Sequence, residues 1–130
     1  MTFSLLALCL STVSAFAQTP VQPALREDVR TTVAEAVRVL EAKDYETFLA
    51  EFLPPELAES RAGSPEDLAA WAQEFSGRAP ALLAALKSIM TQTPTVDEAG
   101  TTATYRLTLE GGPPTLRFVK LGRYWYFGER

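Results

Sequence analysis

The sequence contains no histidine and no asparagine, and its one cysteine is Cys9. The absence of histidine removes the commonest general base and the commonest metal ligand, and the absence of asparagine removes any N-glycosylation acceptor. If the N-terminal segment that holds Cys9 is cleaved, no disulfide, thiol nucleophile or thiolate ligand remains. We therefore expect no metal site and no cofactor, and we nominate no catalytic residue.

Residues 1–17 have the pattern of a secretory signal peptide. The apolar run at 3–10 is too short for a permanent membrane anchor, and Ala15 and Ala17 occupy the small-residue positions of an A-x-A cleavage site. The alternatives are a buried N-terminal helix and a lipoprotein signal at Cys9, which lacks the usual small residue before the cysteine. We predict cleavage after Ala17 and an exported protein, periplasmic or secreted, with no membrane span after cleavage.

Charge is unevenly distributed along a chain whose formal net charge is −4. Residues 18–90 carry seven basic and twelve acidic side chains, whereas residues 91–130 carry five and four. An acidic domain without a basic stripe binds nucleic acid poorly, so we expect no nucleic-acid partner. The carboxylates between residues 27 and 74 are expected to form a solvated acidic face, because charged side chains are seldom buried.

Apolar residues recur at three-to-four spacing between residues 25 and 90, which predicts a series of helices. The first is expected to start at Leu25 and to expose its charged side chains. Asp44 can cap the second helix, which the following prolines end, and the stretch PELAESRAG is expected to form only a loose turn. Ser64 caps the third helix, and Pro80 opens the fourth.

After residue 90 the apolar period changes from 3.6 to 2, which predicts an antiparallel meander broken by glycine and proline turns. We therefore predict an α+β fold in which N-terminal helices pack on one face of a curved antiparallel sheet of about four strands. The domain organisation follows: a signal peptide at 1–17, a proline-bearing tether at 18–23 and a single α+β domain at 24–130.

The terminal stretch KLGRYWYFGER contains four consecutive aromatic residues. With Leu121 and Gly122 as turn residues, Phe118 lies opposite Trp125 and Arg117 opposite Tyr126. Alternation then divides the sheet into two faces. The face predicted to meet the helices carries Ala103, Tyr105, Leu107, Leu109, Leu116, Phe118, Trp125 and Phe127. The outer face carries Thr102, Thr104, Arg106, Thr108, Arg117, Val119, Tyr124 and Tyr126.

Three stretches, AVRVLEAKDYETFLAEFLPPE, TVDEAGTTATYRLTLE and LRFVKLGRYWYF, resemble the NTF2-like superfamily, the cone fold of SnoaL-like and ketosteroid-isomerase-like proteins. The resemblance covers about residues 24–128. Within the superfamily, the chain is most similar to small exported bacterial members of unknown function. It implies helices and a curved sheet that enclose a cone-shaped cavity. Enzymatic branches place an Asp or His base and often a Tyr donor there. This chain has no His and no acidic residue at an inward strand position, which disfavours an isomerase- or dehydratase-like enzyme.

Two groups of residues are candidates for binding. Tyr45, Trp71, Tyr105 and Trp125 are aromatic residues with polar tips that either line a ligand pocket or fill the core. Arg106, Arg117, Tyr124 and Tyr126 form either an interaction surface or an ordinary solvated sheet face. The first hypothesis is a non-catalytic exported domain that binds a small apolar or amphipathic ligand in the cone. The alternative is a protein-interaction or homodimerisation module that uses the sheet face.

Overall fold

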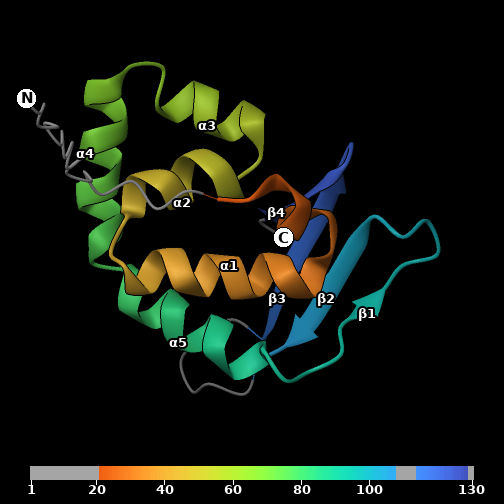
Figure 1. The fold of residues 1–130 in the computed structure, drawn as a ribbon. Coiled ribbons are helices and arrows are strands. Elements are labelled where there is room, and N and C mark those ends of the chain that lie inside the picture. The colour runs from red at the N-terminus through yellow and green to blue at the C-terminus, as the bar shows by residue number, and fades with distance from the viewer. Residues whose placement is uncertain (1–20, 108–113, 129–130) are drawn as a thin grey trace, which may run out of the picture.

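The computed structural model describes residues 21–107 and 114–128. The predicted signal peptide, residues 18–20 of the tether, and the predicted strand residues Thr108 and Leu109 lie outside these ranges. The described chain is helical up to residue 89 and then forms a four-stranded antiparallel sheet. Figure 1 shows the helices gathered on one side of the strands. The predicted α+β class is confirmed.

The chain enters through a short 3₁₀-helix, η1 (Pro23–Glu27), before the first α-helix, α1 (Val29–Glu41). The prediction that this helix starts at Leu25 is wrong. Asp28 has extended backbone angles, and its carboxylate accepts hydrogen bonds from the N–H groups two and three residues on, at 3.0 and 3.2 Å. This N-cap fixes the helix start because it satisfies two donors that have no partner within the helix.

The two prolines after the second helix have a double role. They end α2 (Tyr45–Phe52), whose N-terminus Asp44 caps as predicted, but they also begin α3 (Pro55–Arg61). The expectation of a loose turn over PELAESRAG is therefore wrong. Proline at the first helical position is favourable, since its φ is already helical and the missing N–H would have had no partner there.

The third and fourth predicted helices are present as α4 (Pro65–Ser76) and α5 (Ala79–Ile89). The Ser64 hydroxyl accepts a hydrogen bond from the backbone N–H of Asp67 at 3.1 Å, which is the predicted cap. Because the connection between α4 and α5 is only two residues long, Arg78 is held at the junction of the two helices.

The sheet consists of β1 (Thr95–Val96), β2 (Thr102–Arg106), β3 (Thr115–Leu121) and β4 (Tyr124–Gly128), each paired antiparallel with the next. The order in space is the order in sequence, so the meander prediction is confirmed.

The predicted turn of the last hairpin is wrong by one residue. The turn residues are Gly122 and Arg123, and Phe118 lies opposite Phe127 instead of Trp125. Gly122 takes the first turn position with φ +70°, as glycine does in a II′ hairpin turn, whereas the predicted turn needed Leu121 there. Moving the turn by one residue moves each partner by two.

A shift of two keeps the alternation of side chains, so the predicted division into faces survives the register error. The described residues of the helix-facing side are buried at five positions: Ala103, Tyr105, Leu116, Phe118 and Trp125. The outer positions are half-buried or exposed. The α-helices therefore cover one face of the sheet.

The core contains a continuous series of aromatic contacts that joins the helices to the sheet. Phe48 of α2 stacks on Phe52 and Phe75 with ring centroids 5.5 and 5.3 Å apart, and it meets Phe127 of β4 edge-on at 6.3 Å. Phe127 in turn packs edge-on against Phe118 at 5.3 Å. These rings fix the position of α2 and α4 relative to the sheet.

Lys43, between α1 and α2, has a left-handed backbone with φ +59°, the one non-glycine residue with positive φ in the described ranges. The N–H of Lys43 donates to the carbonyl of Leu40, and that of Asp44 donates to the carbonyl of Val39. This is the Schellman pattern, in which glycine is the preferred residue at the left-handed position. A side chain there carries steric strain.

We expect Lys43→Gly to raise the free energy of unfolding by about 1 kcal/mol, because it relieves this strain at an exposed position. The measurement is the urea midpoint. Lys43→Ala is the matched control: it removes the same side-chain charge but keeps the β-carbon, and it should show no such gain. An equal gain in both variants would assign the effect to charge.

Candidate functional site

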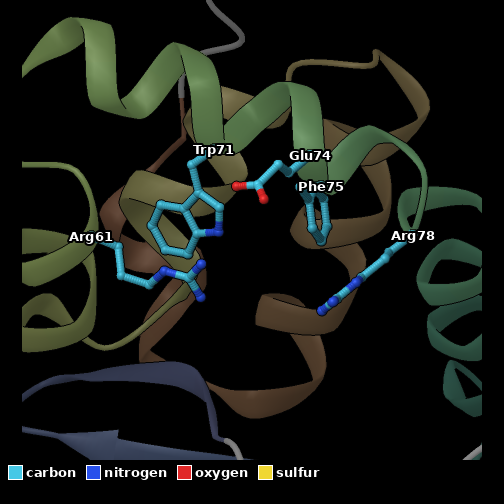
Figure 2. A pocket seen from close by; sticks show the side chains of 5 residues that line it. All are labelled: Arg61, Trp71, Glu74, Phe75 and Arg78. Atoms are coloured by element: carbon cyan, nitrogen blue, oxygen red, sulfur yellow. The ribbon is translucent and has the colours of Figure 1, made fainter.

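A pocket of about 270 Å³ lies beside α4, with its lining drawn in Figure 2. Its residues come from the end of α3, one face of α4 and the junction with α5. On α4 the lining positions are spaced three and four apart, so they share one helix face. The lining residues are Arg61, Trp71, Glu74, Phe75 and Arg78.

The aromatic wall of the pocket is held by the core. Trp71 is only 9% exposed, and Phe75 is half-buried. The Phe75 ring stacks on Phe48 and is met edge-on by Tyr45 at 5.8 Å. A wall packed in this way keeps its shape without a ligand, which limits the entropy lost on binding.

Two guanidinium groups approach the pocket from opposite ends. The Arg61 guanidinium carbon lies 4.9 Å from the Trp71 ring centroid, within the range of a cation–π contact. Figure 2 shows the Arg61 and Arg78 side chains reaching toward one another below the aromatic wall. Arg61 is thus oriented by the indole, and the backbone of Arg78 is held by the tight junction between α4 and α5.

Neither guanidinium has a carboxylate within 4 Å in the described ranges, although Glu74 lines the same pocket. Four other basic side chains do have such partners: Arg26 with Glu51, Arg38 with Glu35, Lys87 with Glu41 and Arg123 with Glu27. The charged groups of the lining sum to a positive charge in a protein of net charge −4. The pocket therefore concentrates cationic donors that have no acceptor in the part of the chain described.

The four predicted ligand residues do not meet in one cavity. Trp71 lines the pocket, whereas Tyr45 lines two other depressions of about 290 and 260 Å³. Tyr105 and Trp125 lie on the inner sheet face, 2% and 6% exposed, within the hydrophobic core cluster. Burial raises the pKa of the Tyr105 phenol, against the smaller lowering effect of the Arg30 charge, so this hydroxyl stays protonated at neutral pH.

The four predicted interaction residues also divide into two pairs. Arg106 and Arg117 are exposed on the outer sheet face. Tyr124 and Tyr126 are half-buried, because the guanidinium of Arg26 lies over both rings, with its carbon 5.3 and 4.7 Å from their centroids. The N-terminal 3₁₀-helix thereby covers the tyrosines of the edge strand.

Arg26 is the residue that the sequence interpretation missed, since it was assigned to a solvated helix face. It is 5% exposed and also lies 5.3 Å from the Phe52 ring centroid. Its Nη1 donates to Glu51 Oε2 at 3.2 Å, but the buried Nε and Nη2 have no hydrogen-bond partner among the described residues. In the sequence, the tyrosines at alternate positions of the last strand, Tyr124 and Tyr126, were the sign that a cation could lie over their rings.

Two carboxylates, those of Asp97 and Glu35, have structural roles. Asp97 caps the β1–β2 turn: it accepts hydrogen bonds from the N–H groups of Thr101 and Thr102 at 2.9 and 3.1 Å, and these bonds lower its pKa. Glu35 is 8% exposed, and its carboxylate oxygens Oε1 and Oε2 accept hydrogen bonds from Arg38 Nε at 2.9 Å and Nη2 at 2.7 Å. The expectation that every carboxylate between 27 and 74 is solvated is wrong for Glu35, because a bidentate pair compensates its burial.

No family model, no curated protein and no solved structure matches this chain. None of the helices within 21–107 and 114–128 is long and apolar enough to cross a bilayer. The same residues contain no group of three or more acidic, cysteine or histidine side chains that could hold a metal ion.

The burial of Arg26 leads to a prediction for the free energy of unfolding of its variants. Arg26→Lys should lower the free energy of unfolding by about 1–2 kcal/mol, because an ammonium is more strongly hydrated and has no plane to stack on the rings. Arg26→Met should stay within about 1 kcal/mol of the wild type, since it keeps the apolar contact and removes two N–H donors without partners. Chemical denaturation gives both values; a Met variant less stable than the Lys variant would contradict this account.

Proposed function

We propose that this chain is an exported, non-catalytic domain that binds a small amphipathic molecule beside Trp71. The observation that carries the proposal is the pocket in which Trp71 and Phe75 form an apolar wall between two arginines. Small-molecule sites combine apolar walls with a few polar groups that orient the ligand. The volume of about 270 Å³ lies just below the usual range of about 300–1,000 Å³, which favours a small ligand.

The inventory of acids and bases supports binding over catalysis. The pocket contains one carboxylate, that of Glu74, and the chain has no histidine to act with it. Asp28, Asp44 and Asp97 accept backbone N–H groups at helix starts or a turn. General acid–base chemistry needs a titratable group placed beside the reacting atoms, and these three serve as caps.

The proposed site differs in position from the cone expected from the resemblance to NTF2-like proteins. It lies beside α3 and α4, whereas Tyr105 and Trp125, which would face into a cone, are packed with the core. We keep the NTF2-like assignment as a hypothesis. Its support is the order of the elements, helices first and then an antiparallel meander with a glycine turn before a Trp-containing strand.

The outer sheet face supports a second candidate, an interaction or dimerisation surface. Its residues on β2 and β3 are half-buried or exposed, in contrast to the buried inner positions. Arg106 and Arg117 supply exposed guanidinium groups there, of the kind enriched at interface centres. The half-burial of Tyr124 and Tyr126 beneath Arg26 reduces the aromatic area that this face offers.

The two tryptophans, Trp71 and Trp125, allow the first candidate to be tested with single-tryptophan variants. In Trp125→Phe, fluorescence reports the pocket; in Trp71→Phe, it reports the core. We expect 4-nitrobenzoate or 4-nitrobenzyl alcohol, two small aromatic quenchers, to quench Trp71 saturably and to leave Trp125 with only weak, linear quenching. The matched variant also corrects for absorption by the probe.

Saturable quenching of Trp125 alone would instead support binding in the cone-shaped cavity that the NTF2-like resemblance implies. Unsaturable quenching of both tryptophans would contradict a binding site for small aromatic molecules. Circular dichroism of each variant establishes that the fold is kept.

For the second candidate, light scattering of the wild type and of Arg117→Glu/Tyr126→Ala measures the molar mass. A face that forms a dimer should give a dimer mass in the wild type and a monomer mass in the variant. A monomer in both would count against self-association. The Arg123→Glu variant, which changes an exposed arginine at the hairpin turn, is the control for added charge.

A further inference from the structure

We propose that the molecule bound beside Trp71 carries a single anionic oxygen group, a carboxylate or a phosphate, held between Arg61 and Arg78. This inference rests on the proposed binding function and names the chemical class of its ligand. The aromatic wall receives the apolar part, and the two guanidinium groups receive the anion. Arginine suits this role, since its N–H groups form a planar fork that matches carboxylate and phosphate oxygens.

Charged side chains in the described part of the chain are paired unevenly. With twelve basic and sixteen acidic side chains in all, a basic group has many potential partners. Arg26, Arg38, Lys87 and Arg123 each have a carboxylate within 4 Å. Arg61 and Arg78 have none, and among the described residues the same holds for Arg30, Lys43, Arg106 and Lys120, but Arg61 and Arg78 line one pocket together. Two cations that share a pocket with one carboxylate leave a net positive charge there, which attracts an anion from solution.

Preorganisation of the pocket also favours anion binding. Arg61 lies over Trp71 with its guanidinium carbon 4.9 Å from the ring centroid. A cation–π contact acts through the charge of the guanidinium, so its N–H donors can still bind other partners. Arg78 precedes α5 directly, and its backbone N–H donates to the carbonyl of Phe75 at 2.8 Å. The Arg61 side chain is therefore held by the indole, and the backbone of Arg78 is held at the helix junction.

The charges of the pocket lining favour a singly charged ligand. Glu74 belongs to α4 and lines the same pocket as the two arginines (Figure 2). Two guanidinium groups and one carboxylate leave one unbalanced positive charge. A carboxylate, with one negative charge, neutralises the lining, whereas a phosphate monoester, with a charge of about −1.5 to −2 at neutral pH, meets repulsion from Glu74. Glu74 thus acts as a selectivity residue that disfavours multiply charged ligands.

The test compares three probes of similar size in the Trp125→Phe background: 4-nitrobenzoate, 4-nitrophenyl phosphate and the uncharged 4-nitrobenzyl alcohol. Quenching of Trp71 gives each dissociation constant. We expect at least one anionic probe to bind about tenfold more tightly than the alcohol, since a charge-assisted hydrogen bond contributes about twice a neutral one. The tighter of the two anions identifies the head group.

Substitutions then assign the anion to its residues. Arg61→Gln and Arg78→Gln should each weaken anion binding about tenfold and leave the alcohol unchanged. Glu74→Gln should tighten anion binding severalfold, since it removes a repulsive charge. Arg106→Gln, an exposed arginine on the sheet, is the matched control and should have no effect. Raising the salt concentration should weaken the anions selectively.

The outcomes separate this inference from the function on which it rests. If the alcohol and the anions bind Trp71 equally, and neither arginine variant changes the anions, the anionic class is overturned while the binding function stands. If none of the three probes quenches Trp71 saturably, both are overturned. Thermal melts of the variants establish that any loss of binding occurs in folded protein.

Discussion

The packing of Phe48 is the interaction on which the rest of the structure depends. Its ring stacks on Phe52 in its own helix and on Phe75 in α4, and it meets Phe127 of the last strand. One fully buried side chain therefore sets the distance between two helices and the sheet. Because Phe75 is also a wall of the pocket beside Trp71, the geometry of that pocket is inherited from the core.

The edges of the fold show a different balance of forces. The 3₁₀-helix lies along β4, the last strand in the sheet order, and Arg26 spans the space between Phe52 and the two tyrosines. Covering an edge strand protects its unpaired backbone groups. The cover is itself imperfect, because two buried nitrogen atoms of Arg26 have no partner in the described ranges, so aromatic contact offsets only part of the desolvation cost.

The same residue type has opposite roles in two places. Arg26 is buried between aromatic rings and has a carboxylate partner, which makes it structural. Arg61 also lies over an aromatic ring, but it is exposed at a pocket and has no such partner among the described residues. Solvent access and the net positive charge of the pocket lining, and not the cation–π contact, are what favour a binding role for Arg61 and Arg78.

Local patterns in the sequence determined much of the fold: the caps at Asp44 and Ser64, the change from helix to strand after residue 90, and the face on which Trp125 lies. These features depend on neighbours in the chain and on alternation. The burial of Arg26 and the pocket at Trp71 were decided by tertiary structure alone. Each depends on residues far apart in sequence, and no local pattern records which distant side chains will meet.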